Sequence, residues 1–600
     1  MSTSGTIDGG STATIDDPRA PVAPPRTAVR GGHPYDPPPA EQHDVPWRDF
    51  QQATRFAVMF GIAAGCFYLT FVVDRSHENV PVLWIATVIA ESIVVLHTLG
   101  IWSTLVSYRN DIPDNEEVAV VRRALLTGAL ATPTTDVFIC HATEPLHLVL
   151  KTAIAAREMQ LPHNTWVLDD GKDPILREAC LRLGIGYIKR ETNAHAKAGN
   201  VNSAVQRTNG RFIVVLDADH VPRPDMLVQT LPILIANPSV ALVQTPQTYD
   251  FAGRGMVAEG AAVSQELFYE AIMPAKNQSN SAFCVGTNVI YRRDALASLV
   301  TRVPTWQERV RARRRNEVAT SQSTAVGREY PRGGIWVGSN SEDIWTSLEL
   351  HKRGWRTVFV PKVLTQGLTP DTITAFLKQQ FRWASGGWEI LLWGKVLRDA
   401  QLTLSQKIQY MMVPSHYALS FATAIFSLLS PIYLLADKSP IRAGFVDWAV
   451  HYVPFYVLMV AVPFVQAGKF RPSAIIVSLA ASPAHVRAFF ATLTRQKAAW
   501  SVTNGSHGGF RLRTIKPHLA IGALGIAAVT LRPFLGGRNL TSTLIAMYFV
   551  GLQLALLVAM LVGSRRADRL AAAAEAEEPT AEEALAMLDE WLSREVTLRG

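Results

Sequence analysis

The chain has 600 residues, of which 48% are hydrophobic and 18% charged, and a formal net charge of +8. This length exceeds what one ordinary hydrophobic core accommodates, so we expect two or more structural units. The apolar content favours a membrane protein. The positive charge has no lysine-rich tract or interleaved aromatics, so it fits cytoplasmic membrane flanks better than a nucleic-acid groove. We therefore expect no nucleic-acid partner.

The cysteines favour a reducing, cytosolic environment, and the first residues favour a disordered tail. The four cysteines, Cys66, Cys140, Cys180 and Cys284, show no metal-binding spacing, which favours reduced thiols. Residues 1–48 are rich in Pro, Gly, Ser, Thr and Asp, so a disordered N-terminal tail is predicted. No charged segment with an adjacent apolar run opens the chain, and we expect no cleavable signal peptide.

The first apolar segment, 49–104, is predicted to hold two transmembrane helices. Its apolar runs 55–73 and 80–104 are each long enough to cross about 30 Å of hydrocarbon. Basic residues precede the first run and follow the second, among them Arg55 and Arg109. The positive-inside rule therefore places the N-terminus and the next domain in the cytosol.

Residues 105–370 have the composition of a soluble domain. Short apolar runs alternate with amphipathic helical patterns, such as 146–160 and 223–236, and this alternation predicts a largely parallel α/β sheet covered by helices on both faces. The runs expected as strands are 136–141, 165–169, 185–189, 212–216, 240–244 and 357–360.

Apolar character returns after residue 400. The predicted order is two transmembrane helices in 401–467, an interfacial helix with a loop in 468–515, two more transmembrane helices in 516–563, and a cytosolic helical tail in 564–600. The candidate spans are 409–436, 446–467, 516–535 and 540–563. The stretch 471–499 is apolar but is interrupted by Pro483 and basic at its end, so we interpret it as interfacial. We therefore expect a helical bundle of about six spans in total, in a multi-pass plasma (inner) membrane protein with both termini cytoplasmic.

Two carboxylates follow the most continuous apolar run of the soluble domain. The run 212–216 ends at Asp217-Ala218-Asp219, and the carboxyl edge of a parallel sheet is where open α/β folds bind ligands. Two carboxylates at such an edge suit Mg²⁺ or Mn²⁺, which in turn binds phosphate oxygens. The alternative is an Asp-rich turn that caps the next helix.

Further charged residues favour the ligand-binding interpretation. Asp169-Asp170-Gly171 also closes an apolar run, although D-G is a common turn dipeptide. Lys197 lies near a predicted helix N-terminus, where it can face a diphosphate, or else it is a surface lysine. Ser341-Glu342-Asp343 begins a helix over 341–352, either as a cap with acids in the first turn or with Asp343 as a general base for a hydroxyl.

A helix expected within 371–400 repeats apolar residues every three or four positions, which predicts that it lies on the membrane surface. The membrane explains its apolar side chains but not Gln379 or Arg382. The Arg382 guanidinium can hold a phosphate in a fork, and Trp383 offers a flat apolar platform for a sugar ring.

Taken in order, these motifs resemble those of processive family 2 glycosyltransferases, and cellulose synthase catalytic subunits in particular. The resemblance covers roughly residues 100 to 515. The motifs that carry it are Asp169-Asp170-Gly171, His195-Ala196-Lys197-Ala198-Gly199-Asn200, Asp217-Ala218-Asp219, Val243-Gln244-Thr245-Pro246-Gln247, Phe283-Cys284-Val285-Gly286-Thr287, Ser341-Glu342-Asp343 and Gln379-x-x-Arg382-Trp383.

The resemblance implies a GT-A fold inserted in the bundle, a UDP-sugar donor and a growing polysaccharide acceptor. The site residues it implies fall into five groups. They are Thr143, Glu144, Asp169, Asp170, Lys197, Asp217, Gln379 and Arg382 for the nucleotide and diphosphate, Asp217 and Asp219 for the metal, Asp343 with Glu342 for catalysis, Trp383, Cys284 and Gly286 for the acceptor, and Val502 and Thr503 for a gating loop.

Several features depart from that family. The gating-type segment lacks the family's lysine, and the tail after residue 563 is too short for a cyclic-di-GMP-binding domain. The basic insert 302–332 is interpreted as a solvated or lipid-facing loop rather than a catalytic one. Glucose polymerised into an exported β-glucan is the leading hypothesis, with periplasmic or cell-wall export partners. The alternatives are another polysaccharide (β-1,3- or mixed-linkage glucan, chitin or hyaluronan), a lipid acceptor, or a silent channel or scaffold.

Overall fold

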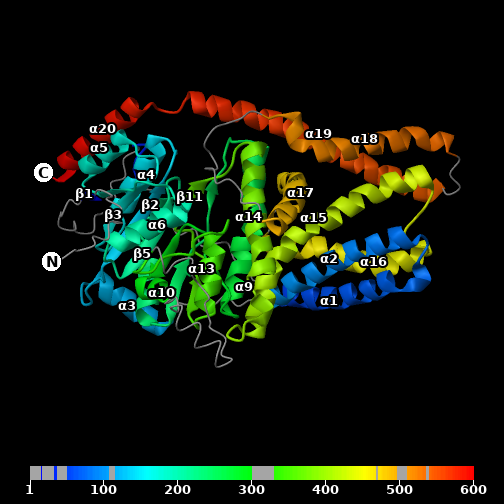
Figure 1. Cartoon of the computed structure of the whole chain (residues 1–600), viewed down its shortest axis with the longest axis horizontal. Coiled ribbons are helices and arrows are strands. Elements are labelled where there is room, and N and C mark those ends of the chain that lie inside the picture. Colours follow the sequence, from blue (N-terminus) through cyan, green and yellow to red (C-terminus); the bar gives the residue numbers. More distant parts are fainter. Residues whose placement is uncertain are drawn as a thin grey trace, which may run out of the picture.

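The computed structural model of the chain describes residues 15–16, 33–36, 51–106, 115–299, 330–467, 471–495, 510–535 and 540–599. An α/β domain lies on the left of Figure 1 and long helices extend to the right. The predicted gating residues Val502 and Thr503 lie outside the described residues, as does the basic insert except for its last residues, 330–332.

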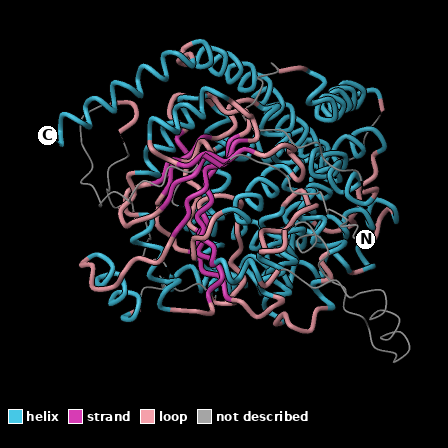
Figure 2. The backbone as a smooth tube through the Cα atoms, turned by 60° about the vertical axis from the view of Figure 1, so that its left-hand side comes forward, coloured by secondary structure: helices cyan, strands magenta, loops and turns pink. Residues whose placement is uncertain are grey.

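Eight strands among the described residues form the main sheet, in the order β1-β4-β3-β2-β5-β9-β7-β10. The six predicted strands are all present, and β4, β3, β2 and β5 run parallel, as do β7 and β10. Figure 2 shows the strands as one twisted layer surrounded by helices. The strands are β1 (Ile15–Asp16), β2 (Thr135–His141), β3 (Asn164–Asp169), β4 (Gly186–Lys189), β5 (Phe212–Asp217), β7 (Val240–Gln244), β9 (Val289–Arg292) and β10 (Arg356–Phe359).

The sequence reasoning missed β9, which lies antiparallel between β5 and β7. A second, small sheet is formed by β6 (Val221–Pro222), β11 (Thr365–Leu368) and β8 (Tyr249–Asp250). Both additions lie next to Asp217-Ala218-Asp219, the D-x-D motif. Strand β5, which ends in this motif, pairs with β9, and β6 begins two residues after Asp219.

The continuous apolar runs of the strands arise because both faces of the sheet are covered. In β2, Val137 and Ile139 belong to one core, while Phe138 and Cys140 belong to the other. The covering helices of the domain are α3 (Glu116–Leu126), α4 (Leu146–Arg157), α5 (Pro174–Leu183), α6 (Ala196–Arg207), α7 (Met226–Ala236), α8 (Met256–Leu267), α9 (Met273–Asn277), α10 (Arg293–Ala297) and α13 (Glu342–His351).

Two short pieces of the predicted disordered tail are ordered in the structure. Ile15 and Asp16 form β1, which pairs antiparallel with β4 at the sheet edge. Tyr35 is buried and its hydroxyl donates to the carbonyl of Ala584 at 3.3 Å. The prediction of disorder is therefore wrong at these residues, because an open sheet edge and an apolar contact stabilise them.

Seven of the described helices are long and apolar enough to cross a membrane. They are α1 (Gln51–Val73), α2 (Pro81–Val106), α15 (Leu404–Ala436), α16 (Phe445–Ala467), α17 (Pro472–Leu493), α18 (Lys516–Leu531) and α19 (Leu540–Ala576). The additional one is α17, which we predicted to be interfacial. In Figure 1 α17 is seen nearly end-on and crosses the direction of the other six.

Helix α14 (Ile373–Trp393) joins the two parts of the molecule. Figure 1 shows it upright between the α/β domain and the long helices. Ala384 and Trp388 pack against α15 and α17, and Ile390 packs against α13. The predicted surface helix is therefore an interface element with both of its sides covered.

The C-terminal helix α20 (Ala581–Arg599) returns to the α/β domain and packs on α4 and α5. Ala584, Leu588 and Trp591 are part of the core on that face of the sheet. Arg157 lies over the Trp591 ring, 5.9 Å from its centroid, and Arg182 pairs with Asp589 at 2.9 Å. The helix of the predicted tail thus completes the core of the α/β domain.

We expect Trp591→Ala to lower the unfolding temperature of the detergent-purified protein. Trp591 is 7% exposed, and truncating a buried tryptophan lowers the free energy of unfolding by about 3 to 5 kcal/mol. The measurement is a thermal unfolding curve by intrinsic fluorescence. Val596→Ala is the matched control, because Val596 on the same helix is 72% exposed and its truncation should leave the curve unchanged.

Candidate active site

The register of the parallel strands brings the predicted acidic residues to one edge of the sheet. His141 at the end of β2 lies opposite Asp169 at the end of β3, and Cys140 lies opposite Asp217 at the end of β5. All three strands stop at this level, so the loops that follow them face the same space.

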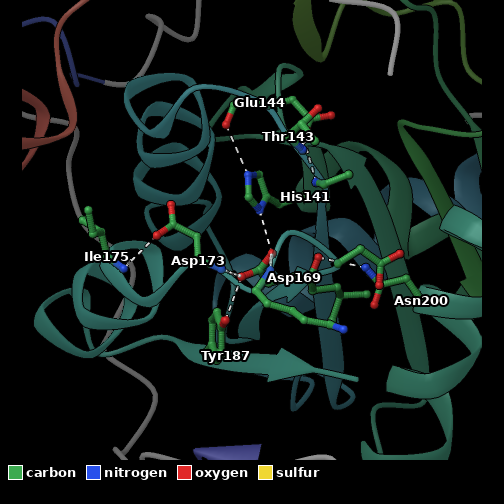
Figure 3. Close-up of polar contacts among 12 residues, drawn as sticks. His141, Thr143, Glu144, Asp169, Asp173, Ile175, Tyr187 and Asn200 are labelled. Atoms are coloured by element: carbon green, nitrogen blue, oxygen red, sulfur yellow. Dashed lines mark hydrogen bonds and ion pairs between the residues drawn. The ribbon is translucent and has the colours of Figure 1, made fainter. Parts of the chain in front are cut away.

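Asp169 holds the loop that follows β3. Its carboxylate contacts the His141 ring at 2.9 Å and accepts from the Tyr187 hydroxyl at 2.7 Å (Figure 3). It also accepts from the backbone amides of Lys172 and Asp173. A carboxylate offers about four acceptor positions, so these contacts fill them. Asp169 therefore shapes the loop after β3, and its assignment to the nucleotide stays a prediction.

The same contacts perturb the proton affinities of the pair. Burial opposes charge on both side chains, but the mutual hydrogen bond lowers the pKa of Asp169 and raises that of His141. His141, which the sequence reasoning placed only within a strand, thus acts as the partner that keeps Asp169 ionised.

Asp170 forms a buried bidentate pair with Arg190, at 2.6 and 2.7 Å. The same guanidinium donates to the carbonyls of Ala194 and Ala196. These contacts fix the turn before α6, where His195 and Ala196 have φ of 60° and 45°. Asp170 thereby sets where α6 begins, and the predicted helix start at this motif is confirmed.

Lys197, in the first turn of α6, pairs with Asp217 and donates to the Gly286 carbonyl at 2.6 Å. Burial would lower the lysine pKa, but the Asp217 charge raises it overall. For Asp217, burial would raise the pKa, but Lys197 lowers it overall. Both groups are therefore charged at neutral pH. Thr287 also fixes β5, because its hydroxyl accepts from the Asp217 amide at 2.8 Å.

Asp217, Asp219 and His220 form the group of potential metal ligands among the described residues, with ligand atoms within 4.8 Å of one another. His220 Nδ1 contacts Asp219 at 2.9 Å, and its buried Nε2 has no hydrogen-bond partner in the described part of the chain. Two carboxylates and an imidazole fit a divalent cation. The predicted metal ligands are thus together, and His220 joins them.

Thr143 and Glu144 follow β2 at the same edge. The Glu144 carboxylate accepts from the amides of Ala142 and Thr143, at 2.8 and 3.0 Å, which closes the loop on itself. Burial raises the Glu144 pKa. Burial also raises the pKa of Cys140 to about 12, and the charges of Lys197, Asp217, Asp170 and Glu144 all act on that thiol. Four of the predicted nucleotide and diphosphate residues therefore lie near the end of β2.

Asp343 approaches this group from α13. Gly286 has φ of 93°, and a side chain there would lie 3.3 Å from the Asp343 carboxylate and 3.9 Å from Nζ of Lys197. Burial raises the pKa of Asp343 to about 7, with a further contribution from the Glu342 charge. Glycine at position 286 thus leaves room for the predicted base and the lysine to face the same space.

Cys284 lies behind Gly286 and is fully buried. Its sulfur accepts from the Tyr291 hydroxyl at 2.9 Å and from the Gly286 amide at 3.2 Å. The side chain thus shapes the loop from inside, and the assignment of Cys284 to the acceptor stays a prediction.

Helix α14 supplies the last predicted residues. Arg382 has no hydrogen bond or ion pair with another described residue, but its charge acts on both Asp217 and Asp343, lowering their pKa values. The Gln379 side-chain oxygen is buried without a partner in the described segments. Trp383 is partly exposed beside them. These groups are available to a ligand.

Comparison with known proteins points to the same chemistry. The family model for glycosyl transferase family group 2 matches residues 212–467. A cellulose synthase catalytic subunit (UDP-forming) from Pseudomonas fluorescens (strain SBW25) is 28% identical over 348 residues, 57% of this chain and 43% of that one. The same-named protein from Xanthomonas axonopodis pv. citri (strain 306) is 29% identical over 292 residues, 48% of this chain and 36% of that one. The chain thus spans less than half the length of these relatives.

Among solved structures, a mannosyltransferase from Pyrobaculum calidifontis in complex with GDP-Man and Mn²⁺ is 16% identical and covers 69% of this chain and 100% of its own, with a TM-score of 0.42.

Residues 212–467 thus match the model for glycosyl transferase family group 2. The chain is similar to cellulose synthase catalytic subunits, as its motifs predict. The predicted α/β domain joined to long apolar helices is confirmed.

We expect the purified protein to bind Mn²⁺ at the Asp217–Asp219–His220 group, seen as loss of the free-ion signal in electron paramagnetic resonance. Asp219→Asn removes one charged ligand and should weaken binding about tenfold or more. Asp250→Asn, an exposed carboxylate on β8, is the control. Equal binding by the Asp219 variant would place the cation elsewhere.

Proposed function

We propose that the protein is a membrane-embedded, inverting and processive glycosyltransferase that adds glucose from UDP-glucose to the end of a β-glucan. The observation that carries this proposal is the position of Asp343. Its carboxylate shares the space around Gly286 with Lys197, which is paired with Asp217 of the D-x-D motif. A base on one side and cations on the other are what sugar transfer to a hydroxyl requires.

In the proposed reaction, Asp343 accepts the proton of the acceptor hydroxyl as that oxygen attacks the anomeric carbon. The bond between the anomeric carbon and the diphosphate oxygen breaks, its electron pair leaves with UDP, and the configuration inverts. A carboxylate with a pKa of about 7 suits this role, because it is substantially ionised at neutral pH and still basic.

The departing UDP gains negative charge, which Lys197 and Arg382 offset. Asp217, Asp219 and His220 would hold the Mg²⁺ or Mn²⁺ ion that supplies further charge compensation to the diphosphate. The loop closed by Glu144, together with Asp170 and Arg190, forms the wall on the nucleotide side.

A polar and aromatic tract leads from α14 into the long helices and supports a polymer path. A side chain at Gly387 would lie 2.6 Å from the Tyr417 ring. Tyr417 packs against His485 at a centroid distance of 5.0 Å, and His416 lies 6.3 Å from the same ring. His416 is exposed although its helix lies within the bundle. Such side chains suit sugar hydroxyls and rings better than lipid tails do.

The contact between α20 and the α/β domain supports a position of the C-terminal helix on the same side of the membrane as that domain. Because α20 packs on that domain, an even number of crossings must separate the two. Helices α15, α16, α18 and α19 give four, whereas a crossing by α17 would give five. We therefore place α17 at the interface, with the domain on the cytosolic side of the plasma membrane.

The names of the relatives support UDP as the leaving group, and the cellulose in those names supports a β-glucan. The alternatives are another polysaccharide or a lipid acceptor, since the donor pocket discriminates by shape. Turnover of a panel of radiolabelled UDP-sugars by the reconstituted protein, followed by linkage analysis, decides among them. An insoluble, glucanase-sensitive product is expected from UDP-glucose, and its absence would exclude a glucan.

Asp343→Asn should reduce transfer about a hundredfold or more, because general bases contribute at least that much. UDP binding, measured by calorimetry, should be retained, since Lys197 and Arg382 remain. Asp294→Asn, an exposed carboxylate on α10, is the matched control and should be fully active. A near-normal rate of the Asp343 variant would remove this residue from the role of base.

The transfer rate of the wild-type protein should rise with pH below about 7 and level off above it, because only deprotonated Asp343 accepts a proton. The Glu342 charge contributes to the raised pKa, so Glu342→Gln should move the rise to lower pH. Initial rates between pH 5.5 and 8.5 test both statements. A flat profile would contradict them.

A further inference from the structure

We propose that Glu389 is a positioning residue for Asp343, an inference that rests on the proposed role of Asp343 as the base. Glu389 lies on α14 and accepts hydrogen bonds from the loop that leads into α13. It thereby connects the loop before the base to the helix carrying Arg382 and Trp383.

Three donors of this loop converge on the Glu389 carboxylate. One oxygen accepts from the Ser339 hydroxyl and from the Asn340 amide at 3.4 Å. The other accepts from the Asn340 side-chain amide at 3.0 Å. Ser339 in turn accepts from the Ser341 amide at 3.0 Å, so the contact extends to the residue before Glu342.

The first turn of α13 depends on this outside support. Ser341 occupies the N-cap position, but its side chain makes no capping hydrogen bond to the helix. The hydroxyl instead faces α14 where Gly386 lies, and a side chain there would come within 1.9 Å of it. The helix start that carries Asp343 is thus fixed by α14 and not by its own cap.

The chemistry of the contact requires a carboxylate at position 389. All three partners are donors, and Glu389 is mostly buried, which raises its pKa. A glutamine would point an N–H group at one of these donors, and an alanine would leave them all without an acceptor. Because a displacement of roughly 1 Å at a reacting group costs up to about a hundredfold in rate, loosening this loop should act on turnover rather than on donor binding.

The first test compares kcat and KM for the donor in reconstituted protein. We expect Glu389→Gln to lower kcat about tenfold and to change KM less than twofold. The double variant Glu389→Gln with Asn340→Asp reverses the polarity of the contact and should restore kcat to within about threefold of the wild-type value. Glu349→Gln is the matched control, since Glu349 is a similarly buried glutamate on α13 that pairs with Lys352 and Arg353.

The second test does not require turnover, so it separates this inference from the proposed function. Hydrogen–deuterium exchange of the full-length protein in nanodiscs should show faster exchange over residues 338–343 in Glu389→Gln, normal exchange in the double variant, and no change there in Glu349→Gln. Unchanged exchange over 338–343 in Glu389→Gln, or a kcat that the double variant fails to restore, would overturn the proposal. Failure of the wild-type protein to transfer any sugar would contradict only the proposed function.

Discussion

The ammonium group of Lys197 lies where the two halves of the proposed reaction meet. It pairs with Asp217 at the end of β5 and donates to Gly286, whose missing side chain leaves space for Asp343. The charge of Lys197 keeps Asp217 ionised in a partly buried position, and a cation site at the D-x-D motif depends on that ionisation. The surrounding structure can be understood as the means of holding this lysine. Asp170 and Arg190 fix the turn before α6, and α6 presents Lys197 from its first turn.

The contrast between the acidic residues follows from their surroundings. Asp169 is buried with four hydrogen-bonded partners and its pKa is lowered, whereas burial with a single amide contact raises the pKa of Asp343 to about 7. One carboxylate therefore serves as a fixed negative charge that shapes a loop, and the other can exchange a proton near neutral pH. Both stand at the start or end of an element and look alike in the sequence, so only the count of donors around each distinguishes them.

Much of the architecture could be predicted because it depends on local pattern. The apolar runs identified six strands of the main sheet, and the runs of membrane length identified the long helices. The strand β9 could not be found in this way, because its four residues, 289–292, are placed by pairing with β5 and β7 rather than by an alternating pattern. The motifs correctly grouped Lys197, Asp217, Asp219 and Asp343. They did not predict the internal contacts of Asp169 and Cys284, because a motif does not show whether a side chain faces the surface or the core. His141, Arg190 and Glu389 were missed, because their contacts with Asp169, Asp170 and the loop before α13 are made by the fold and not by a local pattern.

Helix α14 connects the α/β domain to the long apolar helices, and in the proposed function it contributes to both parts of the site. Its Arg382 acts on the charges of Asp217 and Asp343, its small residues Gly386 and Gly387 admit Ser341 from the domain and Tyr417 from α15, and its Glu389 accepts from the loop before the base. Two adjacent glycines each lower the helix propensity of α14 by roughly 1 kcal/mol. The close packing of Ser341 and Tyr417 against the α14 backbone at these glycines offsets that cost. In the proposed function, this one helix thereby positions the donor, the base and the polymer path.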